Sequence, residues 1–177
     1  MNKRMVSLIG PIAPPQWGPA VKNRIMLDVL QDWEIDVESL NTLEWKRSPF
    51  RFLCRVMGHA WKSRQVILAV SQNGRLTLIP LIGLLGFFRP LHAILMPAGG
   101  TFGPELQALP PLVRKFYLLL LRRFDRICVE RPQLSQQLEA LNLSNVIVLP
   151  NFKVPPVSLP DKKPREGFRL LFLSRIR

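Results

Sequence analysis

Two short loops place residue types that can bind anions and sugars where a predicted strand ends and a helix begins. The first loop contains Gly18, Pro19 and Ala20, and the second contains Gly99 and Gly100. Glycine lets backbone N–H groups approach a ligand closely, and a helix N-terminus favours negative charge. Each loop could therefore hold a phosphate or a sugar. Isolated glycines are also common in ordinary strand-to-helix turns, and on the residues alone that interpretation is the stronger one.

No self-contained catalytic constellation can be assembled from the sequence. The phosphate-binding, dinucleotide-binding and nucleophile-elbow glycine motifs are all absent. His92 opens a predicted strand and His59 lies near a helix end, so both are expected to be structural. Cys54 and Cys128 lie far apart and form no zinc spacing, which favours a reducing compartment. The sequence therefore predicts neither a metal ion nor a bound cofactor, and it leaves the catalytic residues unknown.

The helix predicted over residues 49–61 carries the most informative surface pattern. At 100° per residue, its basic side chains form one narrow stripe beside a wide apolar arc. Such a stripe flanked by tryptophan suits the surface of an anionic membrane. A core helix with solvated charges is the alternative, and both interpretations stay open. A nucleic-acid groove is less favoured, because the aromatic residues are not interleaved with the basic ones. The candidate membrane-binding residues are Arg47, Arg51, Arg55, Trp61 and Lys62.

Composition limits the class of protein. The 177 residues include 25 Lys and Arg against 12 Asp and Glu, a net charge of +13 that implies an acidic partner. With 47% hydrophobic residues, intrinsic disorder is excluded for most of the chain. The longest apolar run, residues 76–88, is shorter than the ~20 residues of a membrane-spanning helix. The apolar run over residues 5–9 is too short for a signal peptide.

Short buried strands alternate with helices along the first 150 residues. Strands are predicted over residues 5–9, 35–40, 66–70, 91–96, 126–129 and 146–149, and helices over 19–33, 49–61, 76–88, 111–124 and 132–141. This alternation predicts an α/β fold with a doubly wound parallel sheet, in which ligands bind at the carboxyl ends of the strands. In the first helix, Val21, Ile25 and Val29 recur every fourth residue and predict its buried side, with Asn23 on the surface.

The domain organisation follows from composition shifts near the C-terminus. Residues 1–150 are expected to form one domain, and the Pro- and charge-rich residues 151–168 an interdomain linker. Residues 169–177 contain a last strand without the helix that should follow it. We therefore expect the sequence to be a fragment, with a second α/β domain after it.

Several segments, taken in order, are similar to those of a known family. They are Gly18-Pro19-Ala20, residues 70–75, residues 98–102, residues 125–130, residues 149–152 with Asn151, and residues 172–176 with Arg175. They resemble the acceptor-side, amino-terminal domain of the family-four glycosyltransferases, followed by the hinge and first strand of the nucleotide-sugar domain. The resemblance covers nearly the whole chain and implies a Rossmann-like domain that is one half of a GT-B architecture.

The resemblance implies an enzyme of polysaccharide biosynthesis. It would transfer a hexosyl group from a nucleotide-sugar to a membrane-associated glycan or lipid-linked acceptor, with retention of configuration. Arg175 matches the family's Arg that holds the donor diphosphate, whereas the family's following Lys and paired glutamates lie beyond this sequence. Met96 and Pro97 stand in the region where the family often carries a His. The fragment alone is therefore expected to be inactive.

The site residues that the resemblance implies are those of the matching loops, the hinge and the donor strand. The expected substrate-binding residues are Gly18, Pro19, Ala20, Gly99, Gly100, Asn151 and Arg175. The expected partners are a nucleotide-sugar donor, a glycan or lipid-linked acceptor and an anionic membrane, with no nucleic acid. The expected location is cytoplasmic, peripheral to the inner face of the plasma membrane. The alternative is a non-catalytic basic module that binds anionic membrane surfaces.

Overall fold

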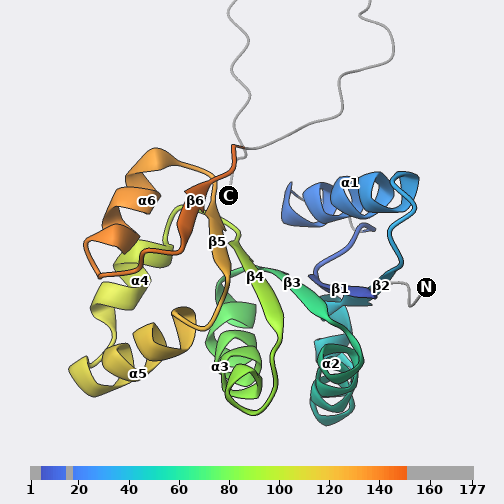
Figure 1. Ribbon diagram of the computed structural model, residues 1–177, viewed down its shortest axis with the longest axis horizontal. Coiled ribbons are helices and arrows are strands. Elements are labelled where there is room, and N and C mark those ends of the chain that lie inside the picture. Colours follow the sequence, from blue (N-terminus) through green and yellow to red (C-terminus); the bar gives the residue numbers. More distant parts are fainter. Residues whose placement is uncertain (1–4, 15–17, 151–177) are drawn as a thin grey trace, which may run out of the picture.

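The computed structural model describes residues 5–14 and 18–150. In this part of the chain, six parallel strands form one sheet in the order β2-β1-β3-β4-β5-β6 (Figure 1). The strands are β1 (Val6–Gly10), β2 (Val37–Asn41), β3 (Gln65–Val70), β4 (His92–Pro97), β5 (Arg126–Val129) and β6 (Val146–Val148). The α-helices are α1 (Gly18–Asp32), α2 (Pro49–Lys62), α3 (Gln72–Phe88), α4 (Phe102–Ala108), α5 (Pro111–Leu121) and α6 (Pro132–Glu139), and η1 (Thr42–Lys46) is a 3₁₀ helix. The predicted doubly wound, Rossmann-like α/β fold is confirmed.

Helices cover both faces of the sheet, but unequally. Residues of α2 to α6 bury one face in a large core, where Phe52, Ile79 and Phe102 join inward side chains of the strands. On the opposite face, α1 is the one described helix, and its Leu27 packs over Leu8 and the neighbouring strand residues. Figure 1 shows α1 on one side of the sheet and α2, α3 and α5 on the other. Along β1, β3, β4 and β5, alternate residues thus face two separate cores.

The change of direction in the strand order lies between β1 and β3. From β1 the chain passes to α1 on one face, whereas from β3 it passes to α3 on the other (Figure 1). Open α/β sheets bind their ligands at such a change of direction, at the carboxyl ends of the strands. The fold therefore directs attention to the loops that follow β1, β2 and β3.

The predicted buried side of α1 was wrong. Its buried residues are Ala20, Asn23 and Leu27, whereas Val21 and Val29 are partly exposed. Asn23 can be buried because its side-chain amide donates to two main-chain carbonyl groups, which offsets the desolvation of the amide. Because one residue on the buried side is polar, a search for apolar residues at helical spacing does not identify that side.

Three elements differ from the sequence-based expectation. Helix α3 begins at Gln72, four residues before the predicted start at residue 76, and Arg75 in its first turn joins a buried network. The helices η1 and α4 were not predicted, since each is only five to seven residues long. The predicted linker over 151–168 and strand over 169–177 lie outside the described residues.

Candidate functional site

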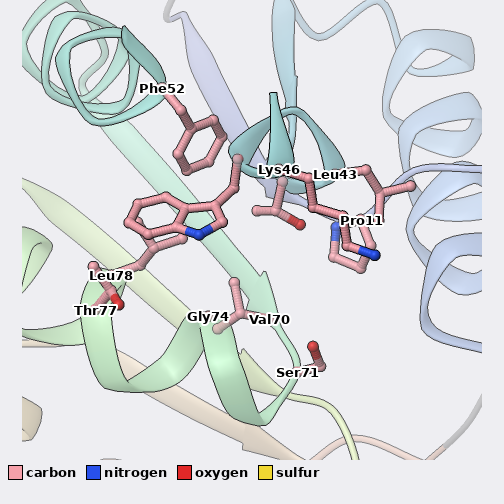
Figure 2. Close-up of a pocket in the computed structure, with 11 residues that line it drawn as sticks. Pro11, Leu43, Lys46, Phe52, Val70, Ser71, Gly74, Thr77 and Leu78 are labelled. Atoms are coloured by element: carbon pink, nitrogen blue, oxygen red, sulfur yellow. The ribbon is translucent and has the colours of Figure 1, made fainter. Parts of the chain in front are cut away.

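A pocket of about 270 Å³ opens at the carboxyl ends of β1, β2 and β3, beside the change of direction in the strand order between β1 and β3. We call it the edge pocket. Figure 2 shows Phe52 and Leu78 on one side of it, Leu43 and Lys46 on another, and Ser71 near the end of β3. Its lining residues are Pro11, Thr42, Leu43, Trp45, Lys46, Phe52, Val70, Ser71, Gly74, Thr77 and Leu78. Its volume lies just below the ~300 Å³ at which ordinary small-molecule pockets begin.

The chemistry of the edge pocket is that of a binding site. Trp45 and Phe52 meet edge to face, with their ring centroids 5.9 Å apart, and give the pocket an aromatic wall. Thr42, Ser71 and Thr77 add hydroxyl groups, which can both donate and accept hydrogen bonds. Among the described residues that line the pocket there is no carboxylate, imidazole or thiol, and Lys46 brings the one titratable group. These residues can hold and orient a polyhydroxyl or partly apolar group.

Asn41 fixes the two loops that form one wall of the edge pocket. Its Oδ1 accepts hydrogen bonds from the backbone N–H groups of Ile12 and Leu43, at 3.3 and 3.1 Å. Its Nδ2 donates to the carbonyl oxygen of Ile12 at 3.2 Å. A single side chain thus joins the loop after β1 to the first turn of η1. The wall is held by specific hydrogen bonds as well as by packing.

Gly10 and Asn23 hold α1 close to the carboxyl ends of β1 and β3. The Nδ2 of Asn23 donates to the carbonyl oxygens of Pro11 and Ala69, at 2.9 and 3.3 Å. A Cβ atom at Gly10 would collide with the Ala69 carbonyl oxygen and lie 2.6 Å from that Nδ2. Glycine is therefore required at the end of β1 for α1 to approach the sheet this closely.

Arg75 connects the two loops that resemble the acceptor-side domain. Its guanidinium donates to the Ala98 carbonyl oxygen at 3.0 Å and to both carboxylate oxygens of Glu105, at 2.8 and 2.7 Å. Thr101 Oγ1 donates to the same carboxylate at 2.6 Å. Burial lowers the pKa of Arg75, and the Glu105 carboxylate opposes that shift. These hydrogen bonds hold the loop after β4 against α3 and α4.

Tyr117 completes this support from α5. Its hydroxyl donates to the backbone carbonyl oxygen of Arg75 at 2.5 Å, and its ring is buried in the main core. Burial raises the pKa of Tyr117, so its hydroxyl stays a donor at neutral pH. Helices α3, α4 and α5 are thereby joined through one arginine.

The structure places the two predicted glycine loops at the same edge of the sheet but not next to each other. Gly18, Pro19 and Ala20 begin α1 after β1, and Gly99 and Gly100 follow β4, with β3 between the two strands. Ala20 is buried, and its place in the first turn of α1 neither confirms nor contradicts the expected ligand contact. Gly99 has a φ of +88°, a conformation that favours glycine, whereas a Cβ atom at Gly18 or Gly100 would meet no neighbour.

The predicted membrane stripe is only partly available on α2. Arg47, Arg51 and Lys62 are exposed, and Trp61 is 57% exposed under the guanidinium of Arg89. Arg55 forms an ion pair with Glu44 of η1, which neutralises its charge locally. The middle of the apolar arc belongs to the core through Phe52, Val56 and Ala60. The wide apolar arc of α2 is therefore divided between residues packed in the core and residues exposed to solvent.

Two further expectations fall outside the part of the chain that the structure describes, namely the ligand contacts of Asn151 and Arg175. Between residues 5–14 and 18–150, no three His, Cys, Asp or Glu side chains gather as a metal site would require. None of the helices in that range is long and apolar enough to cross a bilayer.

Sequence reasoning missed the residues that form the edge pocket. Thr42, Trp45 and Lys46 lie on η1, which has no periodicity to reveal it. A usable signal was present, because Asn41 directly follows the strand predicted over residues 35–40, and an Asn at that point can cap the next helix. Polar and aromatic residues directly after a buried parallel strand lie at the ligand-binding edge. Applied to β2, that rule would have selected these residues.

Comparison with known proteins adds no assignment. No protein-family model matches the chain, and no curated protein matches it.

Proposed function

We propose that this chain is the acceptor-side domain of a GT-B glycosyltransferase. It would take part in retaining transfer of a hexosyl group from a nucleotide-sugar to a glycan or lipid-linked acceptor. The observation that carries the proposal is the edge pocket, which joins an aromatic wall to three hydroxyl groups at the carboxyl edge of a doubly wound sheet. Aromatic faces and a few placed polar groups suit the apolar faces and hydroxyls of a sugar ring.

The side chains of the pocket fit an acceptor-binding role better than a donor-binding role. Among the described residues that line the pocket, Lys46 carries the one charge, and there is no carboxylate, imidazole or thiol. Sugar transfer with loss of a diphosphate needs positive charge at the leaving group and a positioned acceptor hydroxyl. In the architecture that the resemblance implies, the partner domain supplies most of the donor contacts. The described domain would then position the acceptor, which is the role for which its pocket is equipped.

Saccharide binding tests this proposal. Saturation-transfer NMR of the chain with a panel of hexoses and disaccharides should give signals that Trp45→Ala removes. Trp33→Ala is the matched control, because Trp33 is exposed at the end of α1, away from the pocket. Both variants should melt within a few degrees of the parent chain. Saccharide signals that survive Trp45→Ala, or none at all, would contradict the proposal.

Donor binding gives a second, independent test. Calorimetric titration with UDP-glucose and GDP-mannose should show only weak binding, and the chain alone should show no glycosyl transfer. Saturable micromolar binding of either nucleotide-sugar would mean that this domain holds the donor. That result would reverse the acceptor-side assignment.

A second candidate function is that of a basic module on an anionic membrane surface. It is favoured by the exposed aromatic residues at the two ends of α2, Phe50 and Trp61, beside Arg51 and Lys62. Each basic residue near an anionic surface contributes about 1 kcal/mol. Arg51→Glu should therefore weaken sedimentation with phosphatidylglycerol vesicles about tenfold or more at low salt, and much less at high salt. Salt-insensitive or absent binding of the parent chain would end this candidate.

A further inference from the structure

Helices α3 and α5 carry rows of exposed apolar side chains on their outer surfaces. On α3, Phe87 and Phe88 lie three and four residues after Leu84, and on α5 the members are likewise three or four residues apart, so each row lies on one side of its helix. Phe88 and Leu112 are 82% and 81% exposed, which is unusual for side chains of this size. We call this surface the α3–α5 face, and it consists of Leu84, Phe87, Phe88, Leu112, Phe116 and Leu119.

The two rows form one surface because the helices pack closely. A Cβ atom at Gly83 would lie 2.9 Å from the Cβ of Leu120, so α3 and α5 touch where glycine leaves room. The Arg123 guanidinium lies 4.1 Å from the centroid of the Phe87 ring and joins the C-terminal ends of the two helices. Figure 1 shows α5, α3 and α2 side by side in the layer on this face of the sheet.

The charge on the α3–α5 face indicates what kind of partner would bind it. The sequence has no Asp or Glu over residues 71–104 or 106–124, which include both helices and the turns that follow them. Lys115, Arg122 and Arg123 are exposed beside the apolar rows, and Arg89 is half-exposed at the end of α3. A second copy of the same surface would repel this one-signed charge. An anionic surface would attract it, while the apolar side chains would leave water.

We propose that the α3–α5 face lies on an anionic lipid bilayer. Its aromatic and leucine side chains would enter the boundary between headgroups and acyl chains, and its basic residues would contact the lipid phosphates. The inference rests on the second candidate function, membrane association, and moves the main contact from the stripe on α2 to α3 and α5. Trp61 of α2 lies beside Arg89, so the α2 stripe becomes the margin of the surface.

Vesicle co-sedimentation of the full chain tests the proposal. The probes are phosphatidylcholine vesicles with and without phosphatidylglycerol, each at low and high salt. Phe88→Ser with Leu112→Ser should weaken partitioning at least about tenfold at either salt, because apolar burial is lost. Lys115→Ala with Arg122→Ala should weaken it about fivefold per charge at low salt only. Four highly exposed positions are changed, so the melting temperature should stay close to that of the parent chain.

Matched controls separate surface position from residue type. Trp33→Ser removes an equally exposed aromatic residue from α1, on the opposite face of the sheet. Arg131→Ala removes an exposed positive charge at the start of α6. Both controls should leave partitioning unchanged. Controls that weaken binding as much as the α3–α5 variants would overturn the proposal.

The remaining outcomes distinguish this inference from the function on which it rests. If the parent chain binds no anionic vesicles, both fail. If it binds and only Arg51→Glu weakens binding, the membrane function stands and the α3–α5 face is overturned. Sedimentation velocity of the parent chain without lipid should show a monomer. A dimer that Phe88→Ser dissociates would assign the surface to a second copy instead.

Discussion

Removing the carboxylate of Glu105 is expected to cost far more stability than its partly exposed position suggests. Glu105→Gln leaves the guanidinium of Arg75, which is 2% exposed, without its charge partner. Breaking a buried ion pair by removing one member costs about 3–5 kcal/mol, because the remaining charge stays buried. The side chain of Glu105 is 24% exposed, so we take the lower end, about 3 kcal/mol. For a chain of this length, that lowers the melting temperature by about 6–12 °C.

The reverse substitution should cost less. Arg75→Met keeps the buried stem and leaves the Glu105 carboxylate, which water can reach. The main loss is that of the hydrogen bonds that the guanidinium donates, two to Glu105 and one to the Ala98 carbonyl oxygen, about 2 kcal/mol in all. The double variant should therefore be no less stable than Glu105→Gln, since it removes the uncompensated charge.

Urea and thermal unfolding, followed by circular dichroism, measure the three variants. Amide hydrogen exchange at Gly99 and Gly100 reports on the loop itself, and it should accelerate in both single variants. The reasoning would be refuted if Arg75→Met were more destabilising than Glu105→Gln, or if the double variant equalled the sum of the two losses. Either result would mean that the unpaired, buried charge of Arg75 does not determine the loss of stability in Glu105→Gln.

Two further outcomes follow from burial and from close packing. Iodoacetamide should alkylate the exposed Cys54 quickly in the native chain, whereas Cys128 should react only on unfolding, because burial removes access to its thiol and raises its pKa. Intact-mass spectrometry before and after addition of urea measures the two reactions. Two fast-reacting thiols in the folded chain would contradict the prediction. Gly10→Ala should destabilise the chain by about 1–3 kcal/mol because the new methyl group meets the Ala69 carbonyl and Asn23. Gly18→Ala is the control, since its methyl group would meet nothing and should be neutral or stabilising by up to about 1 kcal/mol in urea unfolding.

The strands and the fold class could be predicted because their signal is local. The continuous apolar run of β3 is buried on both faces of the sheet, so its composition alone identifies a central parallel strand. The same holds for β1. Proline at the first position of α2, α5 and α6 marked where those helices begin. The doubly wound arrangement then follows from the alternation of strands and helices.

The site could not be predicted because its determinants are long-range and polar. The burial of Asn23 depends on carbonyl groups from two different strand ends, and nothing near it in the sequence indicates them. Arg75 lies just before the helix predicted from residue 76, and nothing near it in the sequence indicates its partner carboxylate, which lies 30 residues further along the chain. Trp45 lies on a single 3₁₀ turn, which has no amphipathic period. Each of these residues is placed by tertiary contacts, which outweigh local propensity.

Helix α3 belongs to both proposed surfaces, and this has a consequence for how a substrate would arrive. Its first turns supply Gly74, Thr77 and Leu78 to the edge pocket, while its outer side carries Leu84 and Phe88. Leu76, next to Thr77, is itself exposed, so pocket and outer side meet within one helical turn. If that outer side rests on lipid, an acceptor held by its own acyl chain would approach the pocket by lateral diffusion. Its encounter rate would then depend on density per unit area of membrane, and dilution of the surrounding solution would leave that rate unchanged.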